Sequence, residues 1–140
     1  MTVMNRFLRL FMGAGRMPDD VKAALTADGL VLLEEGVFGS VTYRRYRAPR
    51  QYSSYLKQAV SAAIGISAHR VVVWDGRMRQ VDGPPRLLLA GGLTVAAPEP
   101  DQLRISYDAA RFSTDRSGSV EIRLRTTQAG RIVALLTDAA

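Results

Sequence analysis

The chain has 140 residues, 47% of them hydrophobic and 23% charged, which fits one globular domain with a single core. It contains no cysteine, and this excludes disulfides, thiolate metal sites and cysteine nucleophiles. The formal net charge is +6 at pH 7, and the excess of cations is local, which is typical of a surface that meets an anion.

Residues 1–29 are predicted to form an N-terminal helical segment. Residues 4–12 predict a short helix with one apolar face, made of Phe7, Leu10 and Phe11. This face is a candidate interface, and the sequence leaves open whether it packs on the protein itself, on a second copy or on a membrane. A second helix is predicted over residues 18–29, because the segment begins with proline and ends at glycine.

Residues 30–140 are predicted to form the main globular unit, which begins with strands. Residues 30–35 predict a strand that turns at Gly36, and a longer strand follows and stops at Pro49. Tyr43 and Tyr46 are three residues apart, so in a regular strand their side chains would point to opposite faces. We therefore predict a bulge at the two intervening arginines, which returns Tyr46 to the face of Tyr43 and directs both arginines outward.

The rest of the chain predicts more antiparallel strands and then one helix. Strands are predicted at residues 59–67, 70–74, 77–81, 93–97, 101–108 and 119–125. Asp75 and Gly76 predict a hairpin turn, and residues 82–92 predict a connection rich in glycine and proline. Residues 126–140 predict an amphipathic helix with a threonine cap at 126 or 127. The fold class is therefore α+β, mainly β, with about seven strands.

Three segments of the chain resemble the bacterial pleckstrin-homology-like domains. They are "AAIGISAHRVVVWDGRMRQVD", then "LRISYDAARFSTDRSGSVEIRLRTTQAGRIVALL", and "LLEEGVFGSVTYRRYRAP", which is similar to the opening strands of uncharacterised actinobacterial members. The resemblance covers roughly residues 30–137. It implies a bent antiparallel barrel closed by the C-terminal helix, a fold that hosts lipid-headgroup binding, protein binding and scaffolding.

The sequence offers little for catalysis or metal binding. His69 is the single histidine, and strand geometry gives no reason for it to converge with Ser67 and Asp75. A metal site without cysteine would need several carboxylates, but Glu34 and Glu35 are neighbours on a strand and point to opposite faces. We therefore expect no enzyme activity, no metal and no cofactor.

The stretch "VTYRRYRAPRQYSSYLK", residues 41–57, is the strongest candidate for a binding surface. It contains four tyrosines, no acid and five cations: Arg44, Arg45, Arg47, Arg50 and Lys57. Arginine grips phosphate and carboxylate groups through paired hydrogen bonds, and tyrosine stacks or lies at a membrane interface. The alternative is an edge strand and loop with half-buried tyrosines, where arginine opposes aggregation. A nucleic-acid partner is not expected, since there is no aromatic pair on a central strand and no recognition helix.

These features predict a cytoplasmic, non-catalytic binding or adaptor module, peripheral to a membrane where it binds lipid. Its partner would be an anionic surface, either acidic lipid headgroups or an acidic protein patch. The first alternative is a structural protein that self-associates as a homo-oligomer through the N-terminal helix and a sheet edge. The second is a carrier of a small apolar molecule or an enzyme, which would need an internal cavity.

Overall fold

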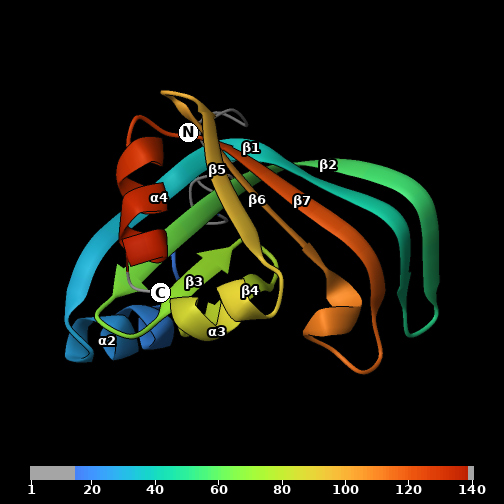
Figure 1. Cartoon of the computed structure of the whole chain (residues 1–140), viewed down its shortest axis with the longest axis horizontal. Helices are drawn as coiled ribbons and strands as arrows, with labels where there is room; N and C mark the ends of the chain where they lie inside the picture. Colours follow the sequence, from blue (N-terminus) through green and yellow to red (C-terminus); the bar gives the residue numbers. More distant parts are fainter. Residues whose placement is uncertain (1–14, 139–140) are drawn as a thin grey trace, which may run out of the picture. The chain divides into compact units, whose positions relative to one another are not determined.

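The computed structural model describes residues 15–138, and the elements are labelled as in Figure 1. The apolar face predicted at Phe7, Leu10 and Phe11 lies outside the described residues. In chain order the elements are α2 (Asp19–Ala27), β1 (Leu30–Ala48), β2 (Gln51–Ser67), β3 (Val71–Trp74), β4 (Arg79–Gly83), α3 (Pro85–Ala90), β5 (Thr94–Glu99), β6 (Gln102–Asp108), the 3-10 turn η1 (Ala109–Arg111), β7 (Ser117–Arg125) and α4 (Ala129–Asp138).

The seven strands are hydrogen-bonded in the order β4-β3-β2-β1-β7-β6-β5. Neighbouring strands run antiparallel in the pairs β1–β7, β2–β3, β3–β4, β5–β6 and β6–β7. The prediction of a mainly β chain with seven antiparallel strands and a C-terminal helix is therefore confirmed. Within residues 15–138, no helix is both long enough and apolar enough to cross a bilayer.

Three boundaries differ from the prediction. The turn at Gly36 is wrong: β1 continues through this residue, whose N–H donates to the Gly15 carbonyl at 2.8 Å. The loop expected before residue 59 is also wrong, because β2 begins at Gln51, directly after a two-residue turn. The connection predicted at residues 82–92 contains α3, whose Leu88 is buried. The glycines and prolines of this segment predicted a loop, but proline is also favoured in the first turn of a helix, and Pro85 is the first residue of α3.

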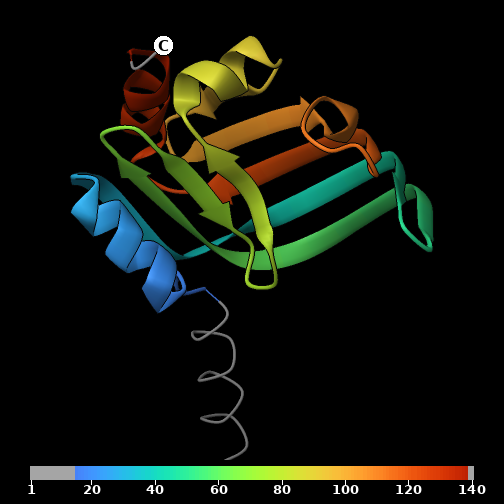
Figure 2. The same cartoon turned by 90° about the horizontal axis from the view of Figure 1, so that it is seen from below.

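The described chain forms two compact units, and β1 and β2 each pass through both. The first unit contains residues 15–38 and 60–84. In it, α2 packs over β2 and β3, and Met17, Val21 and Leu25 contact Ala63 and Val72 (Figure 2). Gly65 permits this close packing, because a Cβ atom there would lie 2.6 Å from Leu25 Cδ1. The small residues in "AAIGIS" therefore let a helix lie directly on the strands.

The second unit contains residues 39–59 and 85–138. Its core is built from the alternating apolar side chains of three strands, which are fully or almost fully buried: Val41, Tyr43, Tyr46, Leu103, Ile105, Val120, Ile122 and Leu124. Helix α4 contacts β5, β6 and α3, and buries Ala129, Ile132 and Leu136. The Thr126 hydroxyl accepts a hydrogen bond from the Gln128 N–H at 3.0 Å, in the turn directly before α4, which begins at Ala129.

Candidate anion-binding surface

The predicted bulge in β1 is present and lies in the second unit. The β1–β7 register shifts between Arg44, which pairs with Ser119, and Arg47, which pairs with Ser117. Tyr43 and Tyr46 are both buried, and their ring centroids lie 4.8 Å apart. Arg44 and Arg45 are exposed. The extra residue thus keeps both tyrosines in the core and turns the arginines outward, as the parity of the sequence predicted.

Gly118 of β7 makes this bulge sterically possible. Its φ is +100°, and a Cβ atom there would collide with the backbone of Arg45 and Tyr46. Any side chain at position 118 would therefore push β7 away from the bulge. The bulge therefore depends on both the "YRRY" of β1 and the "SGS" of β7, although these segments are far apart in the sequence.

The register places Arg44 and Arg47 on one face of the sheet together with cations of two other strands. Directly paired residues of antiparallel strands share a face. Arg44 and Arg47 pair with Ser119 and Ser117, and along β7 the same face continues at every second residue. We call this the basic face, and its arginines are Arg44, Arg47, Arg104, Arg123 and Arg125.

Few acids lie on the basic face. The register places Glu121, Asp108 and Glu99 there. Glu121 accepts ion pairs from both sides, from Arg123 Nε at 3.3 Å and from Arg44 Nη1 at 3.8 Å. Asp108 caps η1 by accepting the Ala110 N–H at 2.9 Å. Within residues 15–138 no carboxylate lies within ion-pair distance of Arg47, Arg104 or Arg125, so the face keeps an excess of positive charge.

Tyrosine rings of β2 hold two of the arginines in place. The Arg47 guanidinium lies 4.8 Å from the ring centroid of Tyr52, and that of Arg44 lies 5.7 Å from the ring of Tyr55. Both rings are more than half exposed. A cation over an aromatic face is attracted by the ring quadrupole, so each ring orients its arginine without neutralising it. Arg44 shares the Glu121 carboxylate with Arg123, whereas no carboxylate of residues 15–138 lies within ion-pair distance of Arg47.

The other three predicted cations occupy different positions on the β1–β2 hairpin. Arg45 is the bulged residue, with φ +50°, and Arg50 is at the turn, with φ +61°. These are the two non-glycine residues with positive φ among residues 15–138. Lys57 follows Tyr55 by two residues on β2 and therefore shares its face, the face of Arg44. The structure thus gathers Arg44, Arg47 and Lys57 on one face and places Arg50 at the hairpin tip.

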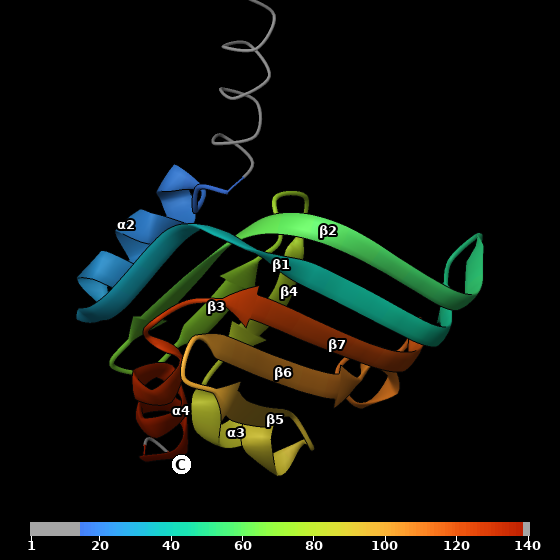
Figure 3. The same ribbon diagram turned by 90° about the horizontal axis from the view of Figure 1, so that it is seen from above.

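The sequence interpretation missed three arginines of the basic face: Arg104, Arg123 and Arg125. The alternation in "DQLRISYD" and "SVEIRLR" already placed them on the wet side of their strands. What the sequence did not show was that β7 pairs with β1, which brings these residues onto the face of Arg44. In Figure 3 the hairpin of β1 and β2 extends beyond the start of β7, with these strands side by side.

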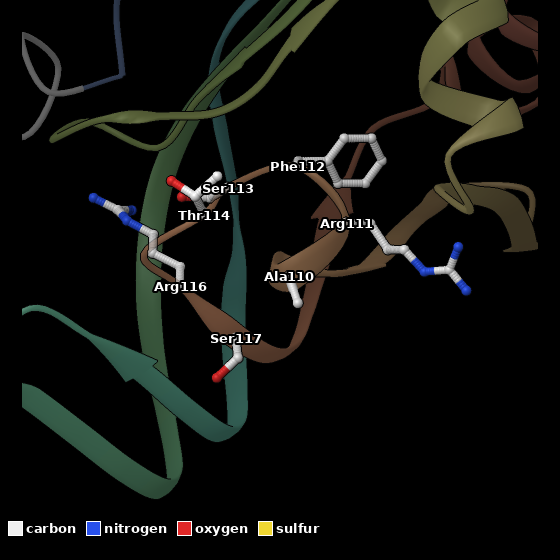
Figure 4. Close-up of a pocket in the computed structure, with 7 residues that line it drawn as sticks. All are labelled: Ala110, Arg111, Phe112, Ser113, Thr114, Arg116 and Ser117. Atoms are coloured by element: carbon white, nitrogen blue, oxygen red, sulfur yellow. The ribbon is translucent and has the colours of Figure 1, made fainter.

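An open pocket lies under the loop between η1 and β7, also in the second unit. It is lined by Ala110, Arg111, Phe112, Ser113, Thr114, Arg116 and Ser117. Figure 4 shows that the side chains of Arg111 and Arg116 point away from each other. Arg116 Nη1 donates to the Tyr46 hydroxyl at 3.3 Å. The pocket therefore does not bring its two cations to bear on one ligand, and the basic face remains the better anion site.

His69 and Ser67 in the first unit meet at a carboxylate that the sequence did not identify. The Ser67 hydroxyl donates to Asp28 Oδ2 at 2.6 Å, and His69 Nδ1 lies 3.0 Å from Asp28 Oδ1. The Ser67 hydrogen bond, followed by those from His69, lowers the pKa of Asp28 to about 2. A serine nucleophile would instead donate its proton to the imidazole. This cluster fastens the end of α2 to the β2–β3 turn.

Other ion pairs of the first unit are also structural. Arg70 and Arg79 both bind Asp82, and the Arg70 hydrogen bonds are the largest cause of the lowered pKa of Asp82. Asp75 accepts the N–H groups of Arg77 and Met78 and closes the β3–β4 turn. In the part of the chain that the structure describes, no three His, Asp or Glu side chains are grouped to hold a metal ion.

Comparison with known proteins adds no family to this description. No protein-family model matches the chain, and no curated protein sequence matches it significantly.

Proposed function

We propose that the protein is a non-catalytic binding module that uses the basic face and the β1–β2 hairpin to bind an anionic surface. The hairpin contributes Arg45, Arg50 and Lys57, and the face contributes its five arginines. Each cation near an anionic surface adds about 1 kcal/mol of binding free energy, so several acting together suffice for reversible association.

One observation carries the proposal: Arg44, Arg47, Arg104, Arg123 and Arg125 share one face, on which Glu121 is the acid that pairs with arginine. Exposed cations of proteins are commonly interspersed with acids. Here a tyrosine ring holds Arg47 without neutralising it, and Arg44, held by another ring, shares the single charge of Glu121 with Arg123. The face is therefore oriented and still charged, which is what binding to phosphate or carboxylate groups requires.

We also propose that the fold is pleckstrin-homology-like and that the protein is cytoplasmic, with membrane association limited to peripheral contact. The antiparallel sheet of seven strands in the order β4-β3-β2-β1-β7-β6-β5, followed by a C-terminal helix, supports the first proposal. The absence of cysteine and the basic face support the second. Both are consistent with a domain that binds one partner surface while acting as a scaffold.

The test is flotation of the full chain with neutral and with acidic lipid vesicles, alongside binding to an acidic peptide, at low and near-physiological salt. We expect binding to the acidic probes that weakens as salt rises, because exposed charges are screened. The double variant Arg47→Glu/Arg50→Glu and the double variant Arg104→Glu/Arg123→Glu should each weaken binding more than about tenfold.

The matched control is Arg86→Glu/Arg131→Glu, which makes the same change of charge on exposed residues of α3 and α4. It should bind as the unmodified chain does once the change in net charge is allowed for. All variants must keep the thermal midpoint of the parent. Folded variants of the basic face that bind acidic probes as well as the control would refute the proposal.

A further inference from the structure

Strand β2 presents a long unpaired edge in the second unit. Its neighbours in the described chain are β1 and β3, and β3 pairs with it from Ala63 to Ile66. Residues 51–59 therefore have β1 on one side and no described strand on the other (Figure 3). At about 3.3 Å per residue this edge is roughly 30 Å long.

The edge has the composition of a strand that accepts another strand. Every second residue of an edge strand directs its N–H and C=O groups outward without a partner. The sequence "QYSSYLKQA" contains no proline or glycine and a single charge, at Lys57. Tyr52 and Tyr55 are 57% and 59% exposed, so large side chains are already available to flank an added strand. Features that usually protect an edge are therefore scarce here.

The charge around the edge decides which occupant fits. Residues 44–57 carry five cations and no acid, and Tyr55 and Lys57 share the face of Arg44. A second copy of the same edge would bring two such sets of cations together, which is unfavourable. A bilayer offers no row of backbone groups to pair with the strand. An extended acidic segment satisfies both the unpaired backbone and the excess of positive charge.

We propose that residues 51–59 bind an extended acidic segment of a partner protein as an additional β-strand. This inference rests on the proposed function and names the partner of the same basic surface. Acidic side chains at every second position of the segment would lie beside Tyr55 and Lys57, on the same face as Arg44, whose guanidinium lies over the Tyr55 ring. The alternate side chains would lie beside Leu56, which is half-buried on the opposite face.

The test uses the full chain and three synthetic peptides as long as the edge. The first alternates Glu and Thr. The second has the same sequence with every backbone nitrogen methylated, which keeps the charge and removes the donors. The third alternates Gln and Thr, which keeps the donors and removes the charge. We expect the second and third peptides to bind at least about tenfold more weakly than the first, because each loses several hydrogen bonds or ion pairs. Amide hydrogen exchange should slow at residues 51–59 when the first peptide binds.

Two variants of the chain provide the matched control. Successive N–H groups of a strand point to opposite sides, so in Ser53→Pro and Ser54→Pro one proline removes an outward N–H and the other removes a bond to β1. The proline that removes an outward N–H should keep the thermal midpoint, and the proline that removes a hydrogen bond to β1 should lower it. The variant that keeps its midpoint must lose affinity for the Glu-Thr peptide.

Each result separates this inference from the proposed function. Equal binding of the methylated and unmethylated acidic peptides would overturn strand addition and leave anion binding in place. Binding to acidic vesicles without binding to any peptide would do the same. No binding to vesicles or peptides would remove both proposals. A dimer that protects residues 51–59 without peptide would show that the occupant is a second copy, and would overturn the inference.

Discussion

Arg70 and Arg79 in the first unit bind one carboxylate, with their nitrogens 2.7 and 2.8 Å from the oxygens of Asp82. Arg47 in the second unit lies against a tyrosine ring and within ion-pair distance of no carboxylate of residues 15–138, and Arg44 lies against another ring and shares Glu121 with Arg123. A carboxylate neutralises the guanidinium that it holds, whereas a ring orients the guanidinium and leaves its charge for a ligand. The same residue type therefore maintains structure in one unit and is available for binding in the other.

The two units also differ in packing, since α2 of the first unit is tightly packed and the β1–β2 hairpin of the second unit is open. The apolar cluster of Met17, Val21, Leu25, Ala63 and Val72, called the α2 cluster, is tightly packed. Leu25 is 0% exposed and Gly65 has no room for a side chain. On the β1–β2 hairpin of the second unit, Tyr52 and Tyr55 are exposed and two residues adopt positive φ. Substitutions in the first region should thus act on stability, and substitutions on the hairpin should act on binding.

The largest expected effect is the loss of stability in Leu25→Ala. Removal of a fully buried leucine leaves a cavity and costs about 2–5 kcal/mol of the free energy of unfolding. Urea unfolding followed by circular dichroism measures this change. Leu87→Ala, at a leucine of α3 that is 65% exposed, is the control and should change stability by less than about 0.5 kcal/mol. Equal effects of the two substitutions would contradict the packing of α2.

A smaller loss of stability is expected for Gly118→Ala. This glycine of β7 lies against the β1 bulge in the second unit, so the substitution should affect both packing and binding. The new methyl group would collide with the backbone at Arg45, at a φ of +100°, so we expect a loss of about 1–3 kcal/mol and weaker binding of acidic probes. Gly130→Ala in α4 is the control, because open space surrounds that position and alanine favours a helix. A variant at position 118 with parental stability and binding would show that the bulge does not position the arginines.

The smallest effect concerns the pH dependence of the first unit. The pKa of Asp28 is lowered to about 2, so its contribution to stability is present above its ordinary pKa of 3.8 and is lost as pH falls toward 2. Carboxyl NMR titration should show this low pKa. Ser67→Ala should raise it toward 3.8, because the Ser67 hydroxyl is the largest cause of the shift, whereas Ser54→Ala on the hairpin should leave it unchanged. A pKa near 4 in the parent chain would show that the Ser67 and His69 hydrogen bonds do not stabilise the charged Asp28 carboxylate.

Local patterns predicted much of the fold. The parity of Tyr43 and Tyr46 predicted the bulge, and the alternation in "SVEIRLR" predicted β7. The pattern failed where tertiary pairing overrides local signals. Gly36 is a turn former that here lies inside a strand, where its N–H is bound by Gly15. Residues 51–58 are polar or aromatic apart from Leu56, and their strand conformation depends on pairing with β1.

The candidate surface could be predicted only in part for the same reason. The cations at 44–57 are contiguous in the sequence and were identified. Arg104 and Arg123 belong to the face through the pairing of β1 with β7 and of β7 with β6, which the sequence does not encode locally. The same holds for Asp28, which meets Ser67 and His69 across about forty residues of chain.

The aromatic residues are divided between the units, and this division makes each unit optically distinct. The single tryptophan, Trp74, packs against the α2 cluster, whereas all five tyrosines, at 43, 46, 52, 55 and 107, belong to the second unit. Tryptophan fluorescence excited at its own absorption edge would therefore follow the melting of the first unit. Tyrosine absorbance would follow ligand arrival at the rings above Arg44 and Arg47. The unmodified protein thus carries its own pair of reporters, and no label is needed to learn whether the two units unfold together.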